Sequence, residues 1–152
     1  MGNSLINNNA VEYSYEGNVI AQVPVELSFI IESIKKSEYI LDLEDDFDDN
    51  GSQKYAKSTW LSSIEFLINY SNSLYDTFNV IIEKPKIYNG PNSSIDILWE
   101  NEKYTFLINI NKNGLDASFY AENNSNTQSI KGQFKLNEYF NSFIPFAVKI
   151  KK

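Results

Sequence analysis

Cysteine, histidine and arginine are all absent from this chain of 152 residues. Without cysteine there is no disulfide and no thiol nucleophile, and without cysteine or histidine a zinc site lacks its usual ligands. The missing histidine excludes a Ser-His-Asp or Cys-His catalytic group within the chain. The missing arginine excludes a bidentate phosphate clamp. These absences predict a protein that is not an enzyme and that uses no metal or other cofactor.

Long apolar runs are missing as well. No stretch reaches the roughly 18 apolar residues that a membrane-spanning helix needs, and the first residues, MGNSLINNNAVEY, lack the charged and apolar regions of a secretory signal. We therefore expect a cytoplasmic protein with no membrane partner.

The net charge of −7 is concentrated in one place. Six of the 20 acidic residues fall in residues 42–49, and the rest of the chain holds 14 acidic residues against 13 lysines. A broad basic face is therefore missing, and direct binding to nucleic acid is not expected.

The apolar pattern changes its period along the chain. A helical spacing occurs at 25–36 and again at about 57–76, whereas residues 95–99, 104–110 and 115–121 alternate with a period of two. Asn113-Gly114 indicates a hairpin turn, 128–134 a further strand, and 136–143 a short helix. The expected fold is α+β: two N-terminal helices packed on an antiparallel meander of about four strands, with a short C-terminal helix. Residues 1–17 are expected to be a flexible arm, and residues 18–152 a single domain.

The acidic segment, which we define as residues 42–49, leads into Asn50-Gly51. With Asp46 as the first position of an EF-hand loop, Asp48, Asn50 and Gly51 fit, but Lys57 occupies the position of the bidentate glutamate. An EF-hand is therefore not expected. Two alternatives are a weak cation site of another kind and a solvated turn in which Asn50-Gly51 supplies positive φ.

Phe47 is the only aromatic residue inside the acidic segment. We expect it to be buried, so that the neighbouring carboxylates point outward as a fixed acidic ridge toward a basic partner. We also expect Trp99 to be buried, because Ile95, Ile97 and Trp99 share the strand face on which the helix 57–76 would pack. The candidate partner-binding residues are Asp42, Glu44, Asp45, Asp46, Asp48 and Asp49, and the candidate structural residues are Phe47, Asn50, Gly51, Trp60 and Trp99.

The stretch from about 41 to 120 resembles a family of small, mostly uncharacterised bacterial and mobile-element proteins. That family carries an aromatic-Asp-x-x-Gly-Ala/Ser loop, a helix, a Pro-rich turn and a strand that ends in Trp. Phe47 stands where Trp is usual, and Gly51, Pro91 and Trp99 match the pattern. The resemblance implies that the 48–51 turn and Trp99 belong to one recurrent architecture, and it implies no catalytic site.

Three functions are consistent with these patterns. The first is a non-enzymatic interaction protein that inhibits or regulates a partner with a basic surface, as antitoxins, immunity proteins and counter-defence proteins do. The second is an acidic mimic of nucleic acid, although its charges are few and local. The third is a metal-dependent enzyme that uses the acidic segment.

Overall fold

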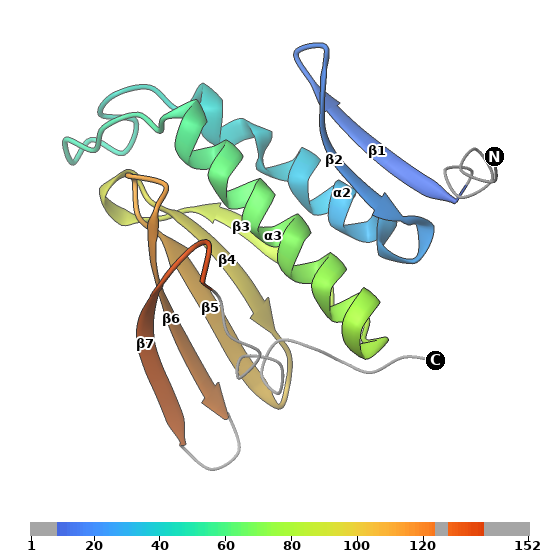
Figure 1. Ribbon diagram of the computed structural model, residues 1–152. Coiled ribbons are helices and arrows are strands. Elements are labelled where there is room, and N and C mark those ends of the chain that lie inside the picture. Colours follow the sequence, from blue (N-terminus) through green and yellow to red (C-terminus); the bar gives the residue numbers. More distant parts are fainter. Residues whose placement is uncertain (1–8, 124–127, 139–152) are drawn as a thin grey trace.

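The computed structural model describes residues 9–123 and 128–138. Within these ranges the chain is α+β, with seven strands in two antiparallel sheets and two helical segments. In Figure 1 the two helical segments lie between the larger sheet and a separate hairpin. The predicted architecture of two N-terminal helices on a four-stranded meander was therefore wrong.

The hairpin lies near the N-terminal end of the described chain. Strands β1 (Ala10–Tyr15) and β2 (Asn18–Pro24) pair through a turn in which Glu16 and Gly17 have φ of 51° and 82°. The Tyr13 side chain is only 2% exposed, and its ring meets that of Trp60 edge-on at 6.5 Å. Within the arm expected over residues 1–17, Ala10–Tyr15 form strand β1, in which Tyr13 is buried and Val11 and Tyr15 are partly buried.

The first helical segment consists of η1 (Val25–Leu27), α2 (Ser28–Lys36) and η2 (Ser37–Asp42). Its apolar stripe is fully buried and comprises Leu27, Ile30, Ile31, Ile34 and Ile40. The second is α3 (Lys57–Phe78), which ends where Asn79 adopts a left-handed conformation with φ of 55°. Such a residue closes the last helical turn by bonding back to its carbonyl groups.

The larger sheet has the strand order β3-β4-β5-β6-β7. Its strands are β3 (Lys86–Asn89), β4 (Ile95–Glu100), β5 (Tyr104–Ile110), β6 (Asp116–Asn123) and β7 (Ser129–Lys135), with the 3₁₀ turn η3 (Pro91–Ser93) between β3 and β4. The turn predicted at Asn113-Gly114 joins β5 to β6, with Gly114 at φ of 71°. Residues 136–138 form a turn after β7, and the rest of the C-terminal helix expected over 136–143 lies outside the described residues.

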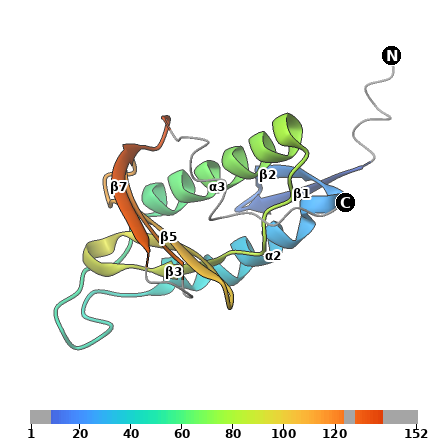
Figure 2. The same cartoon turned by 90° about the horizontal axis from the view of Figure 1, so that it is seen from below.

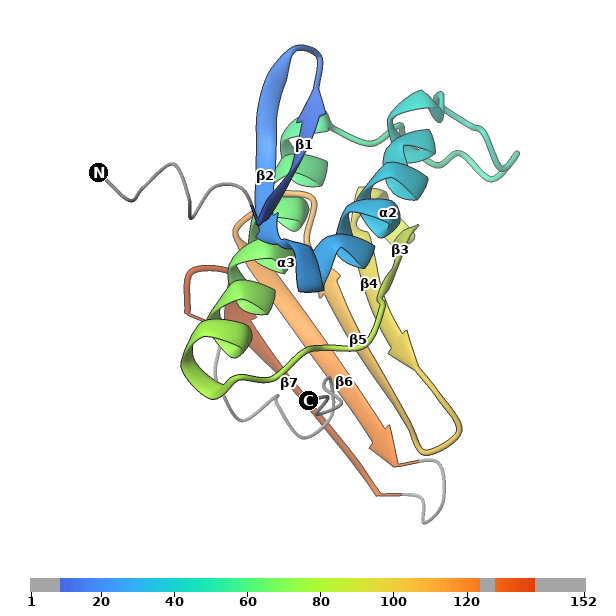
Figure 3. The ribbon, with the colours of Figure 1, turned by 90° about the vertical axis from the view of Figure 1, so that its right-hand side faces the viewer.

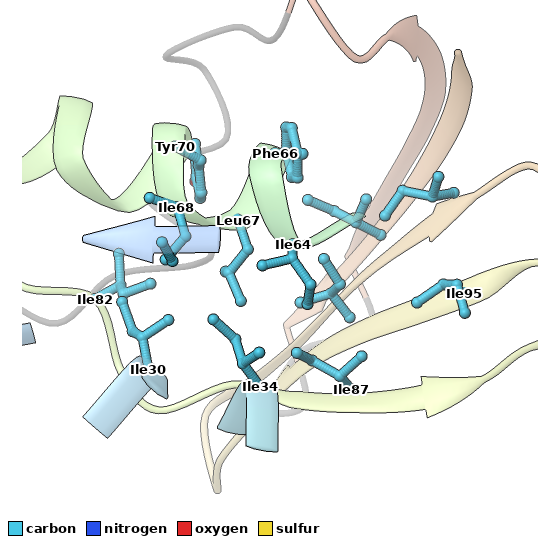
Figure 4. Close-up of a cluster of buried hydrophobic side chains, with 14 of the residues drawn as sticks. Ile30, Ile34, Ile64, Phe66, Leu67, Ile68, Tyr70, Ile82, Ile87 and Ile95 are labelled. Carbon is cyan, nitrogen blue, oxygen red and sulfur yellow. The ribbon is translucent and has the colours of Figure 1, made fainter. Parts of the chain in front are cut away.

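One face of this sheet packs on both helices, as the view from below shows (Figure 2). The close-up in Figure 4 shows Ile34 of α2 beside Ile87 of β3, with Ile64 and Leu67 of α3 above them. Trp99 is 0% exposed, which confirms its predicted burial. Trp60 is also buried, and its Nε1 donates to the Ser37 Oγ at 2.9 Å. Both tryptophans therefore act in the core.

Candidate functional site

The acidic segment begins at the end of η2 and continues into the loop that leads to α3. In Figure 3 this loop projects from the body of the protein beyond the end of α2. All six of its carboxylate residues are exposed. The structure therefore places the predicted partner-binding residues, Asp42, Glu44, Asp45, Asp46, Asp48 and Asp49, in one exposed stretch of the chain.

Several of these carboxylates hold the loop in shape. The Asp46 Oδ1 accepts the backbone N–H of Gly51 at 2.7 Å, and the Asp45 Oδ1 accepts that of Lys54 at 2.9 Å. Asp48 accepts the Ser52 hydroxyl at 2.6 Å and the Asn50 backbone N–H at 3.0 Å. These two hydrogen bonds favour the ionised carboxylate and lower the pKa of Asp48. The loop is thus a closed turn built around its own acids.

The backbone of this turn differs in part from the prediction. Gly51 has the expected positive φ, at 79°, but Asn50 does not. Asp46 and Asp49 instead adopt the left-handed conformation, each with φ of 61°. Aspartate tolerates this region because its short side chain can bond to nearby backbone groups.

Phe47 is 37% exposed, so the prediction that it would be buried was wrong. The physical reason is Tyr55, which occupies the buried position beneath the loop and meets the Phe47 ring at 6.0 Å. The Tyr55 hydroxyl donates to the Gly90 carbonyl at 2.5 Å. Sequence reasoning missed Tyr55, although it is the aromatic residue nearest to the start of α3 and therefore the one best placed to reach the core.

A polar cluster on the outer side of the larger sheet lies next to Gly90, whose carbonyl accepts the hydrogen bond from Tyr55. The Asn109 Nδ2 donates to the Asp96 Oδ1 at 2.7 Å and to the Ser94 Oγ at 2.8 Å. A Cβ on Gly90 would lie 2.6 Å from the Ser94 Oγ, so a larger residue there would require the side chains of this cluster to move. Burial raises the pKa of Asp96, although its hydrogen bond from Asn109 opposes that shift. The cluster fixes the β3–β4 turn, whose Gly90 carbonyl holds Tyr55.

The remaining structural candidates lie away from the acidic segment. Trp99 stacks on Phe106 with ring centroids 5.5 Å apart, and its Nε1 donates to the Glu83 carbonyl at 3.0 Å. Trp60 lies against the hairpin, where its ring centroid is 5.2 Å from that of Tyr15. The two tryptophans support the scaffold and do not line the candidate surface.

The loop's geometry gives little support to a cation site. Among the described residues, no group of three or more acidic side chains is placed to hold a metal ion together. The oxygens of Asp45, Asp46 and Asp48 named above already accept hydrogen bonds from the loop itself. A cation that used those oxygens would compete with these donors.

A scan against protein-family models, a search of curated proteins and a search of solved structures found no match to this chain. Among the described residues, none of the helices has both the length and the apolar character needed to cross a membrane.

Proposed function

We propose that this protein is a non-enzymatic interaction module that inhibits or regulates a partner protein with a basic surface, in the manner of an antitoxin, an immunity protein or a counter-defence protein. The observation that supports this proposal is the closed acidic turn with a 37% exposed Phe47 among its carboxylates. Aromatic residues are enriched at protein interfaces, and the carboxylates around Phe47 would steer a basic surface toward it. The cytoplasm is the compartment that we propose for this interaction.

Two physical effects would favour binding. The hydrogen bonds that Asp45, Asp46 and Asp48 accept hold the loop in one shape before the partner arrives, which lowers the entropy cost of association. The local negative charge would accelerate encounter with a basic surface and make the association rate sensitive to salt.

The carboxylates of the segment fall into two groups that can be tested separately. Those of Asp42, Glu44 and Asp49 accept no hydrogen bond within the described residues, whereas the other three shape the loop. The triple variant Asp42→Asn, Glu44→Gln and Asp49→Asn therefore removes three charges without touching the loop's hydrogen bonds.

The experiment captures the partner with the wild-type protein, identifies it by mass spectrometry, and measures association with the purified partner by surface plasmon resonance. The triple variant is expected to associate about ten times more slowly at low salt. A matched control removes three exposed acids elsewhere, through Asp76→Asn, Glu100→Gln and Glu102→Gln. Equal association rates for wild type, variant and control would refute the acidic segment as the binding surface.

Phe47 allows an independent test of the same surface. Because its ring is partly exposed and rests on Tyr55, Phe47→Ala should change the unfolding midpoint little. It should mainly raise the dissociation rate of the complex, since contacts at the centre of an interface act on dissociation. An unchanged dissociation rate would place Phe47 outside the interface.

The two alternatives have discriminating measurements of their own. A nucleic-acid mimic would compete with an oligonucleotide for the captured partner, whereas simultaneous binding of both would exclude mimicry. A metal-dependent enzyme that uses the acidic segment would release or take up heat in a calorimetric titration with calcium, magnesium or manganese.

A further inference from the structure

A second surface lies beside the acidic segment and has the opposite charge. A groove of about 470 Å³ runs between the α2–η2 segment and the edge strand β3. Figure 3 shows α2 alongside β3, with the acidic loop projecting beyond the end of α2. The groove is lined by Ser33, Lys36, Tyr39, Lys84, Pro85, Lys86, Ile87 and Tyr88.

The floor and walls of the groove are fixed by contacts within the chain. Ile87 is buried at the floor, and the Ser33 Oγ donates to the Pro85 carbonyl at 2.7 Å, which ties α2 to the residues before β3. The Tyr39 hydroxyl donates to the Asn89 Oδ1 at 2.7 Å. Tyr39 and Tyr88 are each 41% exposed, so their rings offer apolar area to an incoming side chain.

The rim carries three ammonium groups in a chain whose net charge is −7. Lys84 forms an exposed ion pair with Glu32 at 2.9 Å, and such pairs contribute little and exchange readily. The other two, on Lys36 and Lys86, are exposed. The groove therefore favours a segment that combines carboxylates with an apolar or aromatic side chain.

The acidic segment has that chemistry, and it lies next to the groove. Helix η2 carries Tyr39 at the groove and ends at Asp42, where the acidic segment begins. Within one molecule the loop is held toward the β3–β4 turn by Tyr55 and by the Ser93 Oγ, which donates to the Gln53 carbonyl at 3.3 Å. In a symmetric dimer each copy presents the same surface to the other, so the groove of each copy can meet the acidic segment of the other.

We propose that the groove binds the acidic segment of a second copy of this chain, with Phe47 seated between Tyr39 and Tyr88 and the neighbouring carboxylates against Lys36, Lys84 and Lys86. This inference rests on the proposed function in one respect, that the acidic segment is a protein-binding surface. It adds a regulatory consequence, because the dimer covers the surface that a basic partner needs. Partner binding and dimerisation then exclude each other.

Sedimentation velocity on the purified full chain tests the dimer without any partner. The wild type is expected to be in a monomer–dimer equilibrium at roughly 50 mM salt and to shift to monomer at roughly 500 mM salt, where charges are screened within a few ångströms. The groove variant Lys36→Glu with Lys86→Glu, and the loop variant Asp42→Asn, Glu44→Gln and Asp49→Asn, should each weaken the dimer by at least about tenfold. A control with the same charge change as the groove variant, Lys103→Glu with Lys131→Glu, should leave it unchanged.

Mixing the two defective variants gives the sharper result. The loop variant keeps an intact groove and the groove variant keeps an intact loop, so one complete contact forms between them. The mixture should therefore contain a heterodimer that neither variant forms with itself. Circular dichroism of each variant checks that the fold is intact.

Three outcomes would overturn this proposal. The first is a wild type that stays monomeric at all concentrations, which would leave the groove to a different acidic partner. The second is a dimer that the control variant weakens as much as the groove variant does. The third is a mixture of the two variants that stays monomeric although the wild type dimerises. None of these outcomes bears on capture of a basic partner, so the proposed function fails or stands by its own experiment.

Discussion

Replacement of Trp99 by alanine tests how the larger sheet is held to α3. The indole is fully buried, stacks on Phe106 and meets the Tyr70 ring edge-on at 6.1 Å. Removing so large a buried side chain leaves a cavity that neighbours fill only partly, and costs about 3–5 kcal/mol. Since each kcal/mol lowers the melting temperature of a chain of this size by roughly 2–4 °C, Trp99→Ala should melt about 6–20 °C below wild type.

The variant Trp99→Phe separates the hydrogen bond from the packing. Phenylalanine keeps an aromatic ring in the cluster but cannot donate to the Glu83 carbonyl, which the indole Nε1 reaches at 3.0 Å. An unpaired carbonyl in this position costs about 1–3 kcal/mol, so Trp99→Phe should fall between wild type and Trp99→Ala.

Urea unfolding followed by far-ultraviolet circular dichroism measures these differences without relying on tryptophan fluorescence. The midpoints should shift while the slope stays constant, which identifies a change in stability rather than in the compactness of the unfolded state. Phe78→Ala is the control, because that ring is 44% exposed and its loss should change the stability by only about 0.5 kcal/mol. A Trp99→Ala midpoint equal to that of wild type would refute the packing described for the sheet and α3.

Three further predictions concern groups whose environment the fold sets. Burial is the main cause that raises the pKa of Tyr13 far above its usual value, and the hydrogen bond to Glu38 and the negative charge of Glu38 add to it. The native state therefore favours the neutral phenol, and the stability of the protein should fall as the pH rises from about 9 to about 11. Urea unfolding should show a smaller fall for Tyr13→Phe than for wild type. Equal falls for the two proteins would contradict this prediction. Gly90→Ala should destabilise the protein by about 1–3 kcal/mol, because the new Cβ would lie 2.6 Å from the Ser94 Oγ; an unchanged urea midpoint would contradict the close approach. The raised pKa of Asp96 means that wild type gains stability from this group as the pH falls through its titration. The free energy of unfolding of Asp96→Asn minus that of wild type should therefore be greatest near about pH 7 and smallest near about pH 4. Urea unfolding curves at these pH values measure this difference, and a difference that does not change with pH would contradict the prediction.

The sequence by itself determined the local elements. The apolar spacing located α3, because a helix buries the side chains that recur every three or four residues, and the same rule located the segment that starts at Val25. The period of two placed Ile95, Ile97 and Trp99 on one buried face, because successive strand residues point to opposite sides. The concentration of acids in residues 42–49 was also visible without a structure.

Tertiary structure alone decided where these elements meet. Strand β1 follows an Asn-rich stretch that gives no strand signal, and its Tyr13 packs against Trp60, a contact between distant parts of the chain. Tyr55, and not Phe47, occupies the buried position beneath the loop, where its hydroxyl donates to the Gly90 carbonyl of a distant turn. Local periodicity carries no information on such long-range pairs. The groove beside β3 exists for the same reason, since its tyrosines and lysines come from two segments that only the folded chain brings together.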